Sequence, residues 1–513
     1  MPARSDSRRL VRTSAKAPAS LLLTVCLLAT AWCPAGAAGA QRLPVLHAAP
    51  DPGAQGRIVD DEGRQVTLRG VNVNALAEYW KGTRFATTFP LERRDPRRLR
   101  AFGWNAIRLL VSWSRIEPRP GRYDERYLAR VRATAARLIR EGLYVFIDFH
   151  QDAWGPTLAA REGETCPAGS TPALGWDGAP GWATLVPRDV PRCAVGGTRE
   201  LSPAVRAAWQ AFWADRAGPG GVGIQRRFLR AVAHTVARVG RARGIAGYDV
   251  LNEPNAFGAA ESAALSRMYA GAVPVIRGAE RRVGAARRLI LFEPSALWSE
   301  TGSGAPPDFA RDRDVVYSPH IYTGAFDDGP ITAQAFETAL DEAKGFGGAP
   351  VLTGEWGAAR SRLDYFQAHL DLQDRFAVAG TQWTWRESCG DPHQRGAALA
   401  GTVATGTFGV WGVDCADNRV LGIGADLVRV LTRGYVRAAP GRVSSVRWDA
   451  KGRALDAAGA RARAGVVLEA FYPGRGRVAA VGLRSVKAGS VPGGELVTAA
   501  ARGGDWRLRV RPR

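Results

Sequence analysis

Short apolar runs alternate with amphipathic stretches between residues 66 and 386. In the amphipathic stretches, of which 127–142 is an example, apolar residues recur at the spacing of one helix face. The runs between them are rich in β-branched and aromatic residues, which is typical of buried strands. Eight runs have this character: 66–73, 106–113, 144–150, 247–253, 289–294, 315–322, 349–356 and 380–385.

Eight strands that alternate with helices predict an α/β fold whose parallel sheet closes into a (β/α)8 barrel, or TIM barrel. A doubly wound open sheet is the main alternative. Such a sheet usually has a glycine-rich phosphate loop after its first strand. Residues 69–80, RGVNVNALAEYW, contain no such loop, and we therefore expect the barrel.

The pattern changes near residue 440. A last helix is expected over 425–438, ADLVRVLTRGYVRA, and short alternating runs divided by Gly and Pro follow it. These runs predict a small antiparallel β-sandwich. We expect a (β/α)8 catalytic domain at residues 41–437 and a C-terminal β-sandwich domain at 438–513.

The first 40 residues have the composition of a secretory signal peptide. Four Arg and one Lys precede the apolar run LLLTVCLLATAW, and small residues follow it. Cleavage is expected after Ala38 or Ala40, and the apolar run is too short for a comfortable membrane span. We therefore expect a secreted protein, either extracellular or periplasmic.

The chain is strongly basic, with a formal net charge of +22. Loss of residues 1–40 would remove five basic residues and one acidic residue and leave +18. The Arg residues are scattered, and no basic run is interleaved with aromatic residues, which argues against nucleic-acid binding. Transient contact with an anionic membrane surface suits this charge better. We expect a monomer.

Two long segments follow the expected third and eighth strands. Residues 151–246 occupy a connection that needs roughly 30–45 residues in a plain unit, and residues 386–415 form the second segment. Each contains two of the four cysteines that lie beyond residue 40: Cys166, Cys193, Cys389 and Cys415. Three pairings are possible, and proximity in the sequence favours Cys166–Cys193 and Cys389–Cys415. There is no Cys-x-x-Cys motif and no tight His/Cys cluster, so we expect neither a metal nor a cofactor.

Polar side chains stand at the expected carboxyl ends of the strands, where barrels keep their active sites. They are Arg108, His150, Asn252, Glu253, His320, Tyr322, Glu355 and Trp383. Each alone has a structural explanation, such as a helix cap, an ion pair or a turn. Together they are harder to explain in that way, because the fourth and seventh strands of a closed barrel face each other across its mouth. Glu253 and Glu355 would then share one space.

Two carboxylates in this position suit the hydrolysis of a glycosidic bond. One must be protonated to release the leaving oxygen, and the other must be ionised to attack the anomeric carbon. Arg108 would hold Glu355 ionised, and Tyr322 would donate a hydrogen bond to the same carboxylate. The remaining residues would contact the sugar or the acid: Asn252 the 2-hydroxyl, His150 and His320 other hydroxyls or the acid, and Trp383 the flat face of the ring.

The motifs LNEPN (251–255) and LTGEWG (352–357), together with these strand-end residues, resemble glycoside hydrolase family 5 of clan A. The resemblance spans residues 66–386. It implies a retaining β-glycosidase on a (β/α)8 barrel, with Glu253 as the acid/base and Glu355 as the nucleophile.

A narrower resemblance is carried by DFHQDAWG (148–155), DGAPGWAT (177–184) and SCGDPH (388–393). These segments are similar to those of endoglycoceramidases and related glycosylceramidases, which cleave the β-glycosidic bond between a sugar or oligosaccharide and ceramide. The resemblance implies that His150, Asp152 and Trp182 contact the sugar next to the scissile bond. It departs after the first strand, where Glu78 stands in a loop in which those enzymes have a lysine.

The leading hypothesis is therefore a secreted glycosidase that acts on glycolipids. The long Trp- and Pro-bearing insertion would supply an apolar groove for the lipid. One alternative is an endo-β-glucanase, a mannanase or another β-glucosidase that acts on soluble glycans. Another is an inactive carbohydrate- or lipid-binding protein, against which the complete set of polar residues argues.

Overall fold

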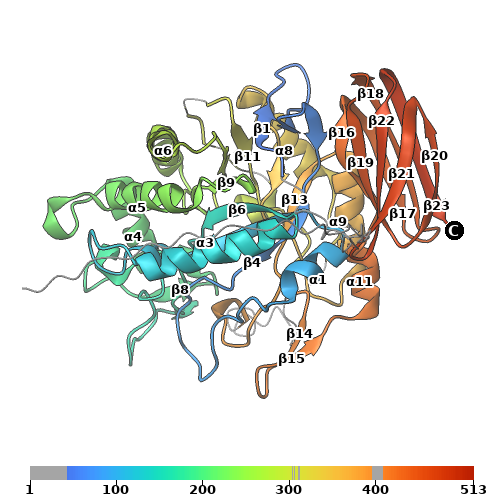
Figure 1. Cartoon of the computed structure of the whole chain (residues 1–513). Helices are drawn as coiled ribbons and strands as arrows, with labels where there is room; N and C mark the ends of the chain where they lie inside the picture. Colours follow the sequence, from blue (N-terminus) through green and yellow to red (C-terminus); the bar gives the residue numbers. More distant parts are fainter. Residues whose placement is uncertain (1–42, 303, 305–306, 310–311, 328, 395–407) are drawn as a thin grey trace, which may run out of the picture. The chain divides into compact units, whose positions relative to one another are not determined.

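The computed structural model describes residues 43–302, 304, 307–309, 312–327, 329–394 and 408–513, and eight parallel strands form its barrel (Figure 1). The strands are β4 (Arg69–Val73), β5 (Ala106–Val111), β6 (Tyr144–Phe149), β9 (Ile245–Asp249), β10 (Leu289–Phe292), β11 (Val315–Tyr317), β12 (Leu352–Thr353) and β13 (Ala379–Gln382). They pair in the order β11-β10-β9-β6-β5-β4-β13-β12, and a parallel bridge between Tyr317 and Val351 joins the two ends. The predicted barrel is confirmed. The predicted signal peptide lies outside the described residues.

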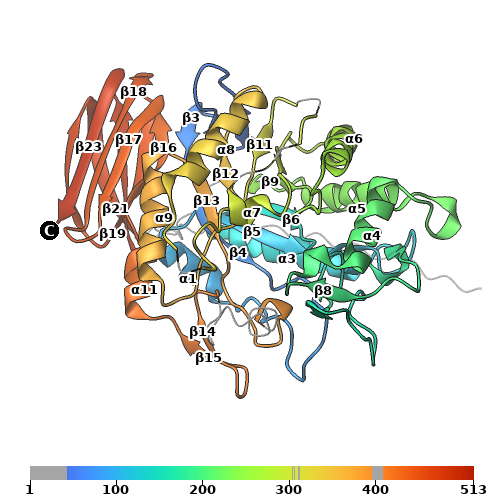
Figure 2. The ribbon, with the colours of Figure 1, turned by 180° about the vertical axis from the view of Figure 1, so that it is seen from behind.

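Helices connect the barrel strands. They are α1 (Asp95–Ala101), α2 (Trp113–Ile116), α3 (Glu125–Arg140), α4 (Pro203–Trp213), α5 (Ile224–Val239), α6 (Ala259–Val283), α7 (Trp298–Thr301), α8 (Ala333–Gly345) and α9 (Leu363–Arg375). The helix α11 (Ala425–Leu431) follows the last barrel strand and precedes the sandwich. Figure 2 shows α8 and α9 on the outer side of the strands. Among the described residues, no helix combines the length and the apolar character needed to cross a membrane.

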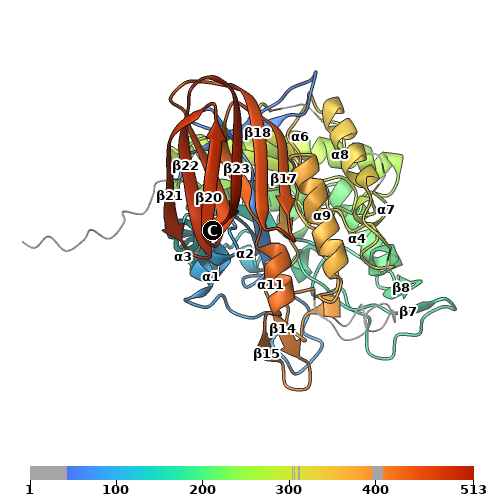
Figure 3. The same cartoon turned by 90° about the vertical axis from the view of Figure 1, so that its right-hand side faces the viewer.

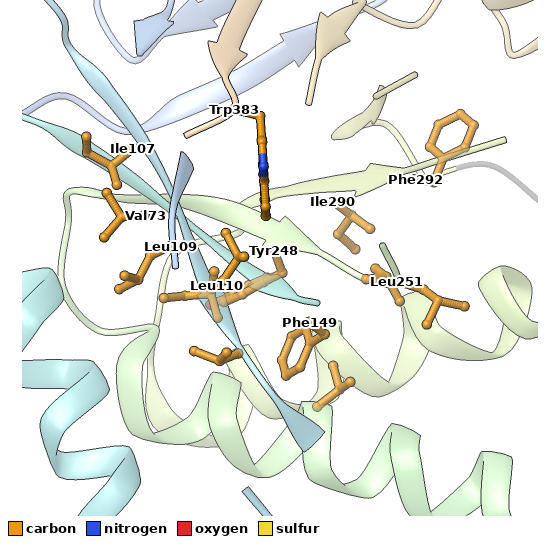
Figure 4. Close-up of a cluster of buried hydrophobic side chains, with 14 of the residues drawn as sticks. Val73, Ile107, Leu109, Leu110, Phe149, Tyr248, Leu251, Ile290, Phe292 and Trp383 are labelled. Carbon is orange, nitrogen blue, oxygen red and sulfur yellow. The ribbon is translucent and has the colours of Figure 1, made fainter. Parts of the chain in front are cut away.

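Strand residues alternate between the barrel interior and the surrounding helices. Toward the amino ends of the strands the interior positions are apolar, and they include Leu68, Ala106, Phe146, Leu291 and Val316. Two residues further along three strands, the same face carries Arg108, Asp148 and Glu293. The intervening positions pack toward the helices, as Ile107, Leu109 and Ile290 do (Figure 4). The interior thus changes from apolar to charged toward the carboxyl ends, where the candidate residues lie.

The insertion after β6 contains short elements and one disulfide bond. Its elements are β7 (Ser170–Pro172), β8 (Cys193–Val195) and the 3-10 helices η1 (Gly181–Ala183), η2 (Arg199–Leu201) and η3 (Pro219–Gly221), besides α4. Cys166 pairs with Cys193, and Cys389 pairs with Cys415 in the segment after β13, as proximity favoured. The second segment also forms the hairpin of β14 (Gly412–Asp414) and β15 (Arg419–Gly422).

Two antiparallel sheets form the sandwich (Figure 3). The strands from the C-terminal region are β16 (Tyr435–Pro440), β17 (Arg442–Asp449), β18 (Ala454–Ala462), β19 (Val467–Pro473), β20 (Gly476–Val481), β21 (Leu483–Val491), β22 (Gly494–Ala501) and β23 (Gly504–Pro512). One sheet also contains three strands from before the barrel: β1 (Leu46–Ala49), β2 (Arg57–Asp60) and β3 (Arg64–Val66). The sequence analysis did not predict these three strands. They bring Leu46 and Ile58 into the same apolar cluster as the barrel interior.

The helix predicted at 425–438 is too long. The helix α11 ends at Leu431, and Tyr435 already begins β16, which pairs with both β3 and β19. Gly434 and the β-favouring residues Tyr435 and Val436 interrupt the helical pattern, and pairing with two strands then decides the conformation. The domain boundary predicted at 437/438 remains a prediction.

Candidate active site

Arg108 lies at the centre of the charged layer. It is fully buried, and its guanidinium contacts four carboxylates: Asp148 at 3.1 Å, Asp249 at 2.9 Å, Glu293 at 3.0 Å and Glu355 at 2.6 Å. It also donates to the side-chain oxygens of Asn72 at 3.1 Å and Asn252 at 2.8 Å. One cation does not balance four buried anions. Burial raises the pKa of all four carboxyl groups, that of Asp148 to about 7, because the charge of Arg108 alone does not offset the cost of burying four negative charges.

Glu355 follows β12 and receives hydrogen bonds at both carboxylate oxygens. Arg108 Nη1 donates to Oε1 at 2.6 Å, and the hydroxyl of Tyr322 donates to Oε2 at 3.0 Å. Burial raises the pKa of Glu355, whereas the charge of Arg108 acts in the opposite direction. These donors favour the ionised form of Glu355, as predicted for a nucleophile.

Glu253 follows β9 and has a different environment. Its Oε1 lies 2.8 Å from Nδ1 of His320, and its backbone N–H donates to Oε2 of Glu293 at 2.8 Å. Its φ of 38° lies in the left-handed region, which costs a non-glycine residue on the order of 1–3 kcal/mol. Burial raises the pKa of Glu253 well above its ordinary value, and the negative charges of Asp152 and Glu200 add to the rise. The protonated form is thus favoured, as predicted for a general acid.

The two glutamates meet beside His320. One oxygen of Glu253, one oxygen of Glu355 and one nitrogen of His320 all lie within 4.8 Å of one another. Burial lowers the pKa of His320 to about 4, so this imidazole is neutral near pH 7. The fold therefore brings the two predicted carboxylates into one space.

A second set of predicted residues adjoins this pair. Asp152 accepts a hydrogen bond from Nδ2 of Asn252 at 2.8 Å, which links it to Arg108 through the same amide. His150 lies 2.8 Å from Asp148, and its ring is stacked with that of Trp383, with centroids 5.3 Å apart. Burial lowers the pKa of His150 to about 4. Asn252 and Asp152 thus form one hydrogen-bonded unit beside Glu253.

Comparison with known proteins shows which family the chain belongs to. A model of the cellulase family, glycosyl hydrolase family 5, matches residues 59–174 and 210–388, more than half of the chain. The chain belongs to glycosyl hydrolase family 5. The chain is therefore a glycoside hydrolase on a (β/α)8 barrel.

Relatives of this family 5 protein include endoglycoceramidase I of Rhodococcus hoagii (strain 103S), which is 27% identical over 281 residues, or 52% of this chain and 51% of the relative. A glucosylceramidase of Cryptococcus neoformans var. grubii is 29% identical over 246 residues, or 39% of this chain and 33% of the relative. The chain thus spans about half or less of the length of these two relatives. The crystal structure of an endogalactoceramidase superposes with a TM-score of 0.80 at 34% identity, over 92% of this chain and all of the other.

Trp182 was also predicted to contact the sugar, but its contacts are with residues outside the set described above. Its indole N–H donates to the backbone oxygen of Glu117 at 2.9 Å, and its ring packs edge to face on Trp113 of α2. Trp176, six residues earlier, donates its indole N–H to Asp152 at 2.9 Å instead. The sequence analysis of this family 5 chain did not assign a role to Trp176. Its position in a loop without periodicity gave no signal.

His393 and Asp391 also escaped prediction, although they belong to the segment SCGDPH. Nδ1 of His393 lies 2.7 Å from Asp391, and Nε2 lies 3.4 Å from Asp152. Burial opposes protonation, but the charge of Asp391 and the contact with Asp152 raise the pKa of His393 well above its ordinary value. The same contact lowers the pKa of Asp152 in spite of its burial. The segment closed by Cys389–Cys415 thus reaches the side chain that we expect to bind the sugar.

Three groups of His and acidic residues in the described part of the chain are close enough to hold a metal ion: His150, Asp152 and Asp177; Glu253, His320 and Glu355; and Glu387, Asp391 and His393. The second group contains the two glutamates themselves. Glycoside cleavage by paired carboxyl groups uses these groups directly. We therefore assign no metal to this site.

Proposed function

We propose that this family 5 protein is a secreted, retaining β-glycosidase that releases the glycan or a single sugar from a ceramide-type lipid by double displacement. The observation that carries the proposal is the pair Glu253 and Glu355, whose oxygens approach within 4.8 Å and whose surroundings differ. A short separation of the carboxyl groups suits a covalent intermediate, because an inverting enzyme needs room for a water molecule between them.

In the first step, ionised Glu355 attacks the anomeric carbon and forms a glycosyl ester, while Glu253 donates its proton to the leaving oxygen. Arg108 and Tyr322 hold the attacking carboxylate through the contacts described above. In the second step, Glu253 removes a proton from water, whose oxygen displaces Glu355 from the sugar. Configuration is inverted twice and therefore retained.

The sugar is held by groups that flank the two glutamates. We assign the 2-hydroxyl of the sugar to Asn252, and Asp152 offers a carboxylate oriented by Asn252 and Trp176 to another hydroxyl. We assign the flat face of the sugar ring to Trp383, which directly follows β13 and is stacked with His150. Bonds to sugar hydroxyls that tighten in the transition state accelerate the reaction.

The relatives described above favour a lipid aglycone. Their names specify ceramide-linked substrates in all three cases, with an unspecified glycan, a glucosyl group or a galactosyl group. Soluble glycans are the alternative, as for an endo-β-glucanase, a mannanase or another β-glucosidase of the same family. The description of the matching family, cellulase, is compatible with this alternative.

The substrate class is tested by incubating the protein with glucosyl-, galactosyl- and lactosylceramide and, in parallel, with soluble β-glucan and β-mannan. Released ceramide and glycan are identified by mass, with the Glu355→Gln variant as the control for contaminating activity. We expect ceramide and an intact glycan from at least one glycolipid. Reducing ends from the polysaccharides, without release of ceramide, would favour the alternative.

We also propose export by residues 1–40 and transient contact with anionic membranes, where glycolipids reside. The charge of +18 that would remain after cleavage supports attraction to such surfaces. The mature N-terminus of protein recovered from the medium or periplasm tests the first point. Salt-sensitive sedimentation with phosphatidylglycerol vesicles, compared with phosphatidylcholine vesicles, tests the second.

A further inference from the structure

Glu293 is a buried carboxylate that the proposed reaction does not use. It follows β10 by one residue, and its exposed fraction is 2%. The alternation of β10 directs Leu289 and Leu291 into the barrel, and Glu293 continues that row. A charged side chain at such a position is costly unless its partners require it.

The partners of Glu293 belong to the surroundings of both Glu253 and Glu355. Its Oε2 accepts the backbone N–H of Glu253 at 2.8 Å. Its Oε1 lies 3.0 Å from Nη2 of Arg108 and 3.1 Å from Nε2 of His320. The backbone of Glu293 is itself fixed, because the hydroxyl of Tyr269 accepts its N–H at 3.1 Å and donates to its carbonyl oxygen at 3.2 Å.

Glu293 thus reaches Glu253 at two points. The first is the backbone N–H, which belongs to a residue in the strained left-handed conformation. Such a conformation persists only where the surroundings impose it. The second is the carboxyl group of Glu253, which contacts Nδ1 of His320 while Glu293 contacts the other ring nitrogen. The first contact fixes the backbone from which the carboxyl group of Glu253 extends, and the second places a carboxylate beside the imidazole that this carboxyl group contacts.

We propose that Glu293 is a positioning residue that holds the acid/base Glu253 in line with the leaving oxygen. The inference rests on the proposed function, in which Glu253 protonates that oxygen. A displacement of about 1 Å at a reacting group is enough to reduce a rate by roughly 10²-fold. Loss of the hold should therefore impair proton donation more than nucleophilic attack.

The substitution Glu293→Gln tests this with almost no change in volume. A carboxylate accepts hydrogen bonds at both oxygens, whereas an amide accepts at one end and donates at the other. Glutamine therefore cannot accept from Glu253 and from Arg108 at the same time. Circular dichroism and the melting temperature verify that the variant is folded.

The measurement is kcat/KM for two leaving groups on one sugar. Phenyl β-glucoside needs protonation of its leaving oxygen, whereas 2,4-dinitrophenyl β-glucoside does not, and the matching β-galactosides form a second pair. We expect Glu293→Gln to lower kcat/KM for the phenyl substrate by about 10²-fold, within the range of general acid catalysis. For the dinitrophenyl substrate we expect a change of a few-fold at most.

Glu280→Gln is the matched control. Glu280 of α6 is also buried, accepts the backbone N–H of Arg288 at 2.9 Å and pairs with Arg277 at 2.9 Å. Arg288 directly precedes β10, so these contacts lie at the amino end of that strand, away from the active site. We expect it to affect both substrates equally. An equal loss for the two substrates in Glu293→Gln would overturn the proposal, as would an unchanged rate.

Glu253→Ala separates this proposal from the proposed function. If Glu253→Ala shows no dependence on the leaving group, the assignment of the acid/base is wrong. If Glu253→Ala shows it and Glu293→Gln does not, only the positioning role is wrong. If Glu293→Gln does not fold, Tyr269→Phe releases the backbone of Glu293, and the same selective loss, at a smaller magnitude, is required of it.

Discussion

The surroundings of Glu355 and of Glu253 differ although the two side chains share one space. Glu355 receives hydrogen bonds from a guanidinium and a phenol, one at each oxygen. Glu253 contacts a neutral imidazole, and the carboxylates Asp152 and Glu200 oppose its ionisation. The donors around Glu355 favour its negative charge against the burial that raises its pKa, whereas burial and the neighbouring carboxylates both favour a proton on Glu253. The same residue type thus acquires two chemical roles from its neighbours.

The largest effect on activity is expected when Glu355 is replaced. Glu355→Gly removes the proposed nucleophile and should reduce hydrolysis of a 2,4-dinitrophenyl glycoside by about 10⁵-fold or more. Azide fits the space that is vacated and should restore turnover with formation of the α-glycosyl azide, detected by NMR. Rescue is not expected for Glu355→Gln, which leaves no space. A β-configured azide from Glu355→Gly would contradict the assignment.

Glu253→Ala should show the opposite behaviour, with a smaller loss. The nucleophile remains, so a dinitrophenyl glycoside still forms the glycosyl ester, and breakdown of that ester becomes slow without the base. We expect a loss of about 10²–10⁴-fold, depending on the leaving group. Azide should accelerate the second step and give the β-glycosyl azide, because it attacks the ester of Glu355. Identical azide products from the two variants would abolish the distinction between the two glutamates.

The barrel strands and the positions of Glu253, Glu355 and Arg108 were predictable from the sequence, because local patterns determine them. Apolar runs rich in β-branched and aromatic residues, separated by helical stretches, predict the barrel strands. A polar residue at the carboxyl end of such a run, as with Glu253 and Glu355, lies at the mouth of the barrel. Arg108 follows the same rule within its own strand, two residues after the interior position Ala106. These inferences need only alternation and the closure of the barrel.

Other parts depend on contacts between distant segments and had no local signal. His393 lies in an irregular segment that is closed by a disulfide bond, and it contacts Asp152, which is far away in the sequence. The strands β1 to β3 are only three or four residues long, too short for a clear periodicity. From Tyr435 onward, pairing of β16 with β19 and β3 decides the conformation, and these partners are far away in the sequence. Trp182 was chosen by resemblance, and only the packed structure shows that Trp176, six residues earlier, contacts Asp152.

Asp152→Asn should change the environment of Glu253 in particular. The negative charge of Asp152 raises the pKa of Glu253, so its removal should lower that pKa. Because Glu253 must be protonated to act, the basic limb of the kcat/KM profile should move to lower pH, while the acid limb stays. A loss of about 10²-fold at the optimum is expected from the altered hydrogen bonds to the sugar and Trp176. Asp374→Asn is the control, since Asp374 pairs with Arg69 at the amino end of β4.

Tyr322→Phe should change the environment of Glu355 with the smallest effect of the four. The phenol donates to Oε2 of Glu355 at 3.0 Å, and such a bond favours the ionised carboxylate. Its loss should raise the pKa of Glu355, so that the acid limb of the kcat/KM profile moves to higher pH while the basic limb stays. We expect a rate loss of about tenfold at the optimum, the effect of one hydrogen bond to a charged group.

The matched control for this variant is Tyr317→Phe, whose hydroxyl donates to Glu342 of α8 at 2.6 Å on the helix side of β11. That substitution removes a buried hydrogen bond between the same two residue types and should leave both limbs in place. Movement of the basic limb in Tyr322→Phe would mean that Tyr322 acts on Glu253. The two glutamates would then titrate as one coupled pair, and the division between an anion-stabilising and a proton-stabilising side would have to be abandoned.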